Sequence, residues 1–364
     1  MEGTLSEVTI TTTKKRRMEE KRGFARDMIF EVLTWLPAKS LMRFRCVSKA
    51  WNSFIRHDPH FVKLHNARSQ TRPLASRLLF EIGTRHREVV ESTSNFPTQL
   101  EGFSLQLARP RHYFDFNEIT ICSNHCNGLV CFYNRKDTQS YLYNVTTGEI
   151  KALPSSLRLP KGSGPTLFLG FDQATERYKL LHVIFYTKKP RIKILTLGTT
   201  SWRIIRGDQY PVSCCFHTCI FLNGVVYWIE YHRPVIYFNF TEEKFVTLSL
   251  PQRSSWNTLN KMQTALWGKL SIYCRFQHER CNLVYDEVNK IFVKSNSTSD
   301  LENEKVALLA PKNVGEKITE CGNIVLATGS VNSASTSLVF PDRFRLDNVS
   351  SFVENIIPLT FIEV

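Results

Sequence analysis

The 364-residue sequence lacks the long apolar stretches of membrane and secreted proteins. No segment approaches the roughly 20 consecutive apolar residues that cross a bilayer. Residues 1–22 contain no apolar run, so no signal peptide is expected there. We therefore expect a protein of the nucleus, the cytoplasm or both, with no membrane partner.

The cysteines do not form a disulfide or metal framework. The ten cysteines are scattered, and the closest groups are Cys122 with Cys126, and Cys214 and Cys215 with Cys219. Neither group has the paired C-x2-C spacing of a zinc site. His125 stands between Cys122 and Cys126, but no second pair of ligands accompanies it. We expect buried, reduced thiols and no metal.

Sequence signatures of catalysis are missing as well. There is no glycine-rich phosphate loop, no His-Glu-x-x-His motif, no nucleophile elbow and no pair of carboxylates at an informative spacing. These absences favour a binding protein, without catalytic residues or cofactors, over an enzyme.

Positive charge is abundant and unevenly distributed. The formal net charge is +14, and residues 23–75 alone hold nine Lys/Arg against three Asp/Glu. Such a basic segment suits an acidic protein or a nucleic acid, and a solvated basic face is the plain alternative. Residues 1–22 are predicted to be a disordered basic tail, in which Lys14, Lys15, Arg16 and Arg17 are a candidate nuclear-import signal.

Residues 23–66 have the spacing of three or four short helices. Apolar residues recur at helical intervals until Pro37 ends the first helix: Met28, Ile29, Val32, Leu33 and Leu36. A second, shorter stripe follows at Leu41, Phe44 and Val47. Ser48 and Asp58 are predicted N-caps of the third and fourth helices. A unit of this size has more apolar side chains than it can bury alone, which implies a partner or a neighbouring domain.

Residues 67–76 are polar and are predicted to be a joint, and residues 77–364 have a recurring pattern of strands. One element is an Asn-Gly turn before an apolar strand, at 127–128 and 223–224, with weaker copies at Gly268 and Gly322. The other is an aromatic strand, a polar turn and a return strand, beginning near Asn144, Asp172, Asn239 and Asp286.

The glycine turns are separated by one or two multiples of the roughly 40–50 residues that a propeller blade requires. The pattern predicts an all-β, propeller-like domain of about six blades, or an incomplete propeller, with an irregular β-sandwich as the alternative. The fold class is then α+β and multidomain, with a short helical unit in front of the β domain.

Residues 24–61 resemble an F-box, above all through Leu-Pro-x-Lys-Ser-Leu-x-Arg-Phe-Arg-Cys-Val-x-Lys-x-Trp at 36–51. The family usually opens with Leu-Pro, where this chain has Phe24 and Ala25. The β part resembles the F-box-associated domain of a large plant family. The matching pieces are Asn-Gly-Leu-Val-Cys at 127–131, Leu-Gly-Phe-Asp at 169–172, Asn-Gly-Val-Val-Tyr-Trp at 223–228 and Phe-Val-Glu-x-Ile-x-Pro-Leu at 352–359.

The resemblance implies an F-box that docks on a Skp-type adaptor and, through it, on a cullin. The adaptor-binding residues that it implies are Phe24, Met28, Leu33, Leu36, Pro37, Leu41, Arg43, Arg45, Val47, Lys49 and Trp51. Of these, Arg43, Arg45 and Lys49 would steer association with an acidic adaptor, and Trp51 is expected to pack partly inside the helical unit.

The function that follows is that of a substrate receptor of a Skp–cullin–F-box ubiquitin ligase, with an unknown target protein held by the β domain. An F-box scaffold or decoy without a role in ubiquitination is the alternative. A nucleic-acid-binding protein is less favoured, because no stripe interleaves basic and aromatic residues, and a propeller hydrolase or oxidase has no motif in its support. Basic loops at 109–112, 188–191 and 231–233 are candidate target-binding segments, with ordinary solvated loops as the favoured alternative.

Overall fold

The computed structural model of the chain describes most of the helical region and the strands of the β region. The described residues are 26–71, 77–84, 99–100, 103–107, 119–122, 125–134, 139–154, 167–184, 191–205, 219–228, 235–248, 258–264, 270–276, 279–286, 288–295, 322–329, 344–351 and 353–362. They divide into two compact units. The first holds the helices together with Glu354–Pro358, and the second holds the strands together with residues 359–362.

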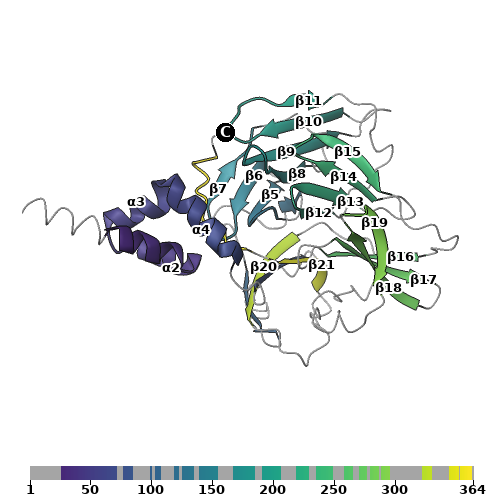
Figure 1. The fold of residues 1–364 in the computed structure, drawn as a ribbon, viewed down its shortest axis with the longest axis horizontal. Coiled ribbons are helices and arrows are strands. Elements are labelled where there is room, and N and C mark those ends of the chain that lie inside the picture. The colour runs from purple at the N-terminus through teal and green to yellow at the C-terminus, as the bar shows by residue number, and fades with distance from the viewer. Residues whose placement is uncertain are drawn as a thin grey trace, which may run out of the picture. The chain divides into compact units, whose positions relative to one another are not determined.

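The helical unit consists of four short helices (Figure 1). The first spans residues 26–34 and is followed by α2 (Ala38–Phe44), α3 (Lys49–His57) and α4 (Pro59–Thr71). Both predicted caps are confirmed, because the Ser48 hydroxyl accepts from the Trp51 amide and the Asp58 carboxylate accepts from the His60 and Phe61 amides. Helix α4 continues to Thr71, so residues 67–71 of the expected joint are helical.

One core holds the helices together. Its fully buried members are Leu33, Ala38, Leu41, Phe54, Ile55, Phe61, Val62 and Ile356. The Phe30 ring packs edge-on against both Phe54 and Phe61, with ring centroids 5.6 and 5.2 Å apart. Seven of the eight buried residues come from the helices, and Ile356 comes from the segment that follows the last strand.

The described strands of the β unit form five antiparallel sheets (Figure 1). Four of them are built from four consecutive strands each. They are β4 (Ile119–Ile121), β5 (Leu129–Asn134), β6 (Gln139–Asn144) and β7 (Ile150–Ala152); β8 (Leu167–Asp172), β9 (Arg177–Ile184), β10 (Arg191–Thr196) and β11 (Arg203–Ile205); β12 (Cys219–Leu222), β13 (Val225–Trp228), β14 (Val235–Asn239) and β15 (Lys244–Leu248); and β16 (Thr258–Thr264), β17 (Ser271–Phe276), β18 (Glu279–Asp286) and β19 (Ile291–Ser295).

The fifth sheet joins strands from both ends of the β unit. Its order is β2 (Gln99–Leu100), β3 (Phe103–Leu107), β20 (Gly322–Gly329), β1 (Arg77–Thr84) and β21 (Phe344–Ser351). Strand β1 pairs with β20 on one side and β21 on the other. Four-stranded meanders with one sheet that joins early and late strands are the architecture of a β-propeller, which confirms the expected propeller-like domain. Against the expected number of about six blades, the part of the chain described here supplies five sheets.

Local turn chemistry explains why the strands reverse where they do. Asn127 and Gly128 have φ of 49° and 76°, and Asn223 and Gly224 have φ of 50° and 78°. Two successive positive φ values define the tight hairpin turn that Asn-Gly favours, so both predicted turns are confirmed. Gly322 begins β20, and Gly268 lies outside the described residues.

The second predicted element is also confirmed. At the end of a strand, Asn144, Asp172, Asn239 and Asp286 each accept two backbone N–H groups from the residues two and three positions later. The residue four positions later has a positive φ in each case, at Gly148, Glu176, Glu243 and Lys290. The side-chain oxygen therefore fixes the reversal, and the same turn recurs in four sheets.

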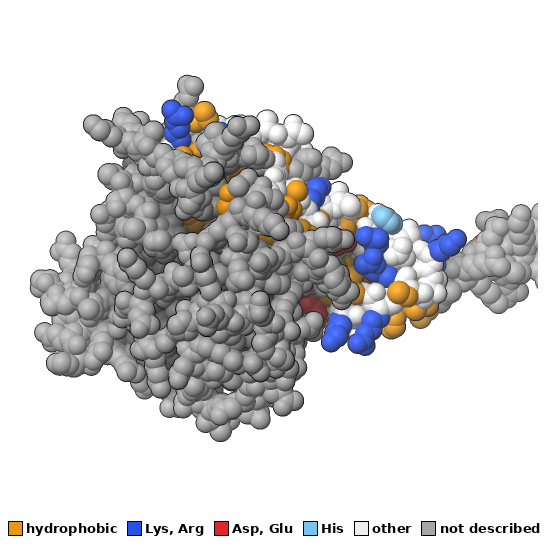
Figure 2. Space-filling view, turned by 180° about the vertical axis from the view of Figure 1, so that it is seen from behind, with side chains coloured by type: hydrophobic (Ala, Val, Ile, Leu, Met, Phe, Trp, Pro, Cys, Tyr) orange, Lys and Arg blue, Asp and Glu red, His pale blue; other side chains and the backbone are white. Residues whose placement is uncertain are grey.

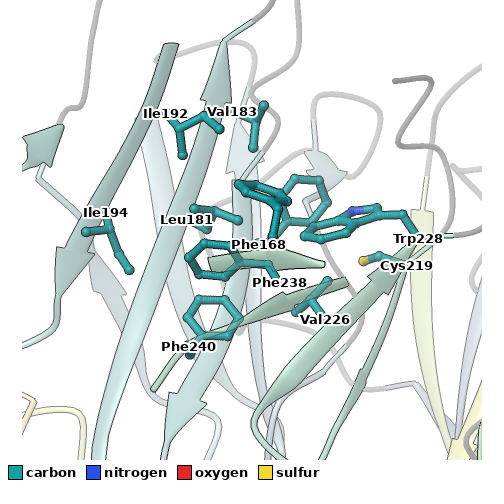
Figure 3. Packing of buried hydrophobic residues seen from close by; sticks show 11 residues of the cluster. Phe168, Leu181, Val183, Ile192, Ile194, Cys219, Val226, Trp228, Phe238 and Phe240 are labelled. Atoms are coloured by element: carbon teal, nitrogen blue, oxygen red, sulfur yellow. The ribbon is translucent and has the colours of Figure 1, made fainter. Parts of the chain in front are cut away.

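The best described core of the β unit lies between the sheet of β8–β11 and the sheet of β12–β15 (Figure 3). From the first sheet come Phe168, Leu181, Val183, Ile192 and Ile194, and from the second come Cys219, Val226, Trp228, Phe238, Phe240 and Phe245. Strand β9 is buried at every position after Arg177. Such continuous burial is typical of a strand that is covered on both faces of its sheet.

Candidate functional site

The first helix presents apolar side chains to the core and to the surface. Leu33 is only 2% exposed, whereas Met28, Val32 and Trp35 are each more than half exposed. Ile29 is 37% exposed and lies on the same outer side by helical spacing. We call Met28, Ile29, Val32 and Trp35 the apolar stripe. The helical spacing of Met28, Ile29, Val32, Leu33 and Leu36 predicts a single apolar face. This is wrong, because Leu33 lies in the core whereas Met28, Ile29 and Val32 are exposed.

Trp35 is held in place although it is exposed. The Arg68 guanidinium lies 4.4 Å from the centre of the indole ring, in a cation–π contact. The indole N–H donates to the Glu31 carboxylate at 3.3 Å, and Arg68 forms an ion pair with the same carboxylate at 2.6 Å. Hydrogen bonds, first from Arg68 and then from Trp35, lower the pKa of Glu31. An exposed aromatic ring fixed in this way loses little side-chain freedom on binding.

Positively charged side chains are exposed in the same helical unit as the apolar stripe. Arg26, Lys39, Arg43 and Lys49 are exposed. On the face seen in Figure 2, hydrophobic and Lys/Arg side chains of the helical unit lie next to each other. Residues 26–71 contain eight Lys/Arg and three Asp/Glu, so the surface is basic as the sequence indicated.

The residues that the resemblance placed at an adaptor-binding face have different environments. Met28 and Val47 are exposed large hydrophobics, at 55% and 60%. Pro37, Arg43 and Lys49 are exposed, and Leu36 and Arg45 are half-buried. Leu33 and Leu41 belong to the unit's own core. Phe24 lies outside the described residues.

Trp51 is half-buried and packs edge-on against Phe44, with ring centroids 5.5 Å apart. Its expected partial packing inside the helical unit is therefore confirmed. Ile29, Val32 and Trp35 were missing from the expected face. A signal for Trp35 was available, because it follows Met28 by seven residues and Val32 by three, which is the spacing of one helix face.

Among the described residues of the β unit, Lys179, Asp172 and Glu243 form a buried ion-pair cluster. The Lys179 ammonium lies 2.8 Å from Asp172, 2.9 Å from Glu243 and 2.9 Å from the Phe240 carbonyl oxygen, which accepts from it. Burial by itself would raise the pKa of Asp172, but hydrogen bonds from Lys179, Thr175 and Thr241 outweigh it and hold this pKa well below its ordinary value. Because Asp172 lies in one sheet and Glu243 in the turn of the next, the cluster joins two sheets, and we interpret it as structural.

The cysteines that the structure describes do not form a reactive site. The described cysteines are Cys46, Cys122, Cys126, Cys131 and Cys219, and each carries a reduced thiol. Burial raises the pKa of Cys126, and burial together with the neighbouring Cys131 raises that of Cys122. A thiol whose pKa is raised is a poor nucleophile.

Among the described residues there is no group of three His, Cys, Asp or Glu that could hold a metal ion. Within the same residues, no helix has both the length and the hydropathy to cross a bilayer. The basic segments at 14–17, 109–112, 188–190 and 231–233 lie outside the described residues, and Arg191 begins β10.

Two protein families match this chain. Residues 25–63 match the F-box domain, and residues 79–340 match the F-box associated beta propeller domain. F-box protein At3g57590 of Arabidopsis thaliana is 36% identical over 212 residues, which cover 56% of this chain and 50% of that protein. F-box protein At3g49450 of the same plant is 27% identical over 286 residues, covering 72% of this chain and 68% of that protein. The chain spans 50% to 62% of the length of three such relatives.

Solved structures show only distant likeness. TolB from Acinetobacter baumannii aligns with 10% identity and a TM-score of 0.36, over 75% of this chain and 70% of that chain. A chain of a nidogen/laminin complex aligns with 12% identity and the same TM-score of 0.36, over 75% of this chain and 97% of that chain. Nothing further follows from TM-scores of this size.

The F-box match covers the first three helices and the start of α4, and the second match covers most of the β unit. The chain therefore belongs to the family of F-box proteins that carry an F-box associated beta propeller domain.

Proposed function

We propose that this chain is a substrate receptor of a Skp–cullin–F-box ubiquitin ligase, and that its apolar stripe is part of the surface that docks on a Skp-type adaptor. F-box proteins in general bind such adaptors. The observation that carries the proposal is the exposure of Met28, Val32 and Trp35, at 55%, 57% and 53%, on one side of the first helix and the turn that follows it.

Exposure of this kind costs free energy unless a partner covers it. Complete burial of a Val or Met side chain contributes about 1.5–3 kcal/mol. The side chains of the stripe are about half exposed, so covering them can supply part of the stability of a protein complex. Clustered exposed hydrophobics in a soluble protein mark an interaction surface. Trp35 is the strongest candidate for an anchor, because Trp residues dominate binding energy at interfaces and Arg68 already orients this one.

The exposed charges of the helical unit fit an acidic partner. Arg26, Lys39, Arg43 and Lys49 are exposed and lie in the same short unit. Such charges raise the association rate and the salt dependence of binding more than the final affinity. The β domain would then hold a target protein, and its contribution to ubiquitin transfer would be proximity.

The direct test is the affinity of the full chain for a purified Skp-type adaptor. Val32→Arg places a charge in the middle of the stripe and is expected to weaken binding by about 10-fold or more. Ile204→Arg is the matched control, because Ile204 is 62% exposed in the β unit. Equal affinity of the two variants would show that the stripe is not the docking surface.

A receptor is distinguished from a scaffold or decoy by the fate of its target. Proteins captured by proximity labelling from cells should be stabilised when the chain is depleted, and the Val32→Arg variant should fail to restore their turnover. Captured proteins with unchanged half-lives would favour an F-box scaffold without a role in ubiquitination.

A further inference from the structure

The segment Glu354–Pro358 follows the last strand of the β unit but is part of the helical unit. The resemblance predicts that it belongs to the β domain, as part of the closing motif at 352–359. Ile356 is only 1% exposed, and it packs in the same core as Leu33, Leu41 and Phe61. Ile357 packs against that core from the edge. The F-box core therefore contains a side chain that lies outside the F-box sequence.

Helix α2 begins without a cap of its own. Its N-cap residue is Pro37, which makes no side-chain hydrogen bond to the helix, and its first turn has no acidic residue. The Glu354 carboxylate supplies what is missing, since Oε2 accepts from the Ala38 amide at 2.9 Å. Ala38 is fully buried. A carboxylate at this position satisfies a buried donor and interacts favourably with the positive end of the helix dipole.

A second contact fastens the segment to helix α4. The Asn66 side chain donates to the Asn355 side-chain oxygen at 2.8 Å, and its own oxygen accepts from the Ile356 amide at 3.1 Å. The Asn355 oxygen also accepts from the Ile357 amide at 2.9 Å. Because Asn66 uses both its donor and its acceptor, the position of the segment is defined at two successive residues.

The Glu354 contact lies at the corner between the first helix and α2, residues 36–38, and helix α4 contacts both this corner and the segment. On one side of this corner, the buried His65 of α4 makes a hydrogen bond of 2.9 Å with the Leu36 carbonyl oxygen. On the other side, Glu354 holds Ala38. The corner determines how the helix that carries the apolar stripe is oriented relative to α2, and it includes Leu36 and Pro37, which the resemblance places at the adaptor.

We propose that Glu354–Pro358 completes the structure of the F-box. In this proposal, Glu354 is a positioning residue that holds residues 36–38 in the geometry needed for adaptor docking. Glu354 and Ala38 are 316 positions apart in the sequence. Adaptor binding is thus linked to a segment that the chain supplies only after the strands of the β unit. The effect of Glu354 on adaptor docking rests on the proposed function. Its effect on the structure of residues 36–38, the structural half of the inference, does not.

The test compares Glu354→Ala, Glu354→Gln and a matched control in the full chain. The control is Glu242→Ala, which removes the same charge from an exposed position of the β unit. Hydrogen exchange measured by mass spectrometry reports on peptides covering residues 36–44. We expect exchange there to rise about 5-fold in Glu354→Ala, as loss of one helix cap predicts, and less in Glu354→Gln, which keeps an acceptor oxygen. Peptides from β5 and β9 should not change, because a general loss of stability would affect them too.

Adaptor affinity is the second measurement on the same proteins. We expect Glu354→Ala to weaken binding about 5-fold relative to Glu242→Ala, with Glu354→Gln in between. Unchanged exchange in Glu354→Ala overturns the whole inference, and raised exchange with unchanged affinity overturns the positioning role. Wild-type protein that does not bind the adaptor overturns the proposed function, while raised exchange still supports the structural half. If Glu354→Ala does not fold, Glu354→Gln and Ile356→Val answer the same questions with smaller changes.

Discussion

Gly170 and Phe240 are in direct contact across two neighbouring sheets. A methyl group at Gly170 would lie only 2.0 Å from the Cε2 atom of the Phe240 ring. Gly170 lies in β8, and Phe240 follows β14 and is fully buried. The ring cannot move aside easily, because it packs edge-on against Phe238, with ring centroids 5.1 Å apart, and the Phe240 carbonyl oxygen accepts from Lys179. Glycine at 170 is therefore required by the approach of the second sheet.

The contact predicts that Gly170→Ala destabilises the β unit. We expect a loss of about 2–4 kcal/mol in the free energy of unfolding, measured by urea denaturation, because a well-packed core must shift to admit the methyl group. Gly148→Ala is the control: no atom lies within 4 Å of the added methyl group, and only the positive φ of 74° opposes it. That change should cost about 1 kcal/mol. If both variants unfold at the same urea concentration, the contact does not limit packing.

The features that sequence patterns predicted correctly are local ones. The Asn127-Gly128 and Asn223-Gly224 turns depend on backbone angles that those residues tolerate, so no other part of the chain is needed to predict them. The same holds for Ser48 and Asp58, whose side chains reach amides only two or three residues away.

The features that sequence patterns missed depend on distant partners. The motif Leu-Gly-Phe-Asp was recognised at 169–172, but the reason for its glycine is a ring 70 positions later. Glu354 acts on the Ala38 amide, which lies 316 positions earlier in the sequence. On the first helix, apolar residues occupy both sides, so spacing alone does not decide whether Leu33 or Val32 faces the core. That choice is made by the packing of α3, α4 and Ile356.

The lowered pKa of the buried His182 side chain predicts how the stability of the protein depends on pH. Burial, with a contribution from the Lys193 ammonium, lowers the pKa of His182 to about 4. In an unfolded chain a histidine titrates near pH 6.5. Between these values the unfolded chain binds the proton and the folded protein does not, so stability is complete above about pH 6.5 and falls as the pH drops toward 4.

We expect the wild-type protein to lose about 2 kcal/mol more of its unfolding free energy between pH 7 and pH 4.5 than His182→Gln does. The measurement is urea denaturation of both proteins across this range. The comparison removes the effect of Asp172, which is present in both. His57→Gln, a change at an exposed helix residue, serves as the control. Parallel stability curves for wild type and His182→Gln would contradict the prediction.

The contact between Trp35 and Arg68 makes it possible to separate two contributions to adaptor affinity: that of the Trp35 ring and that of its fixed orientation. Trp35→Ala removes the ring and is expected to weaken adaptor binding by about 10-fold or more. Arg68→Gln keeps the ring but removes the cation–π contact and the ion pair with Glu31. The Trp35 ring then has more conformational freedom to lose on binding. We therefore expect the affinity for the adaptor to fall only about 3-fold, mainly because dissociation becomes faster. Surface plasmon resonance with immobilised adaptor measures both rates, and Ile204→Ala controls for loss of an exposed apolar side chain in the β unit.

A Trp35→Ala variant that binds as tightly as wild type would exclude the ring from the interface. An Arg68→Gln variant that binds as weakly as Trp35→Ala would show that Arg68 itself contacts the adaptor.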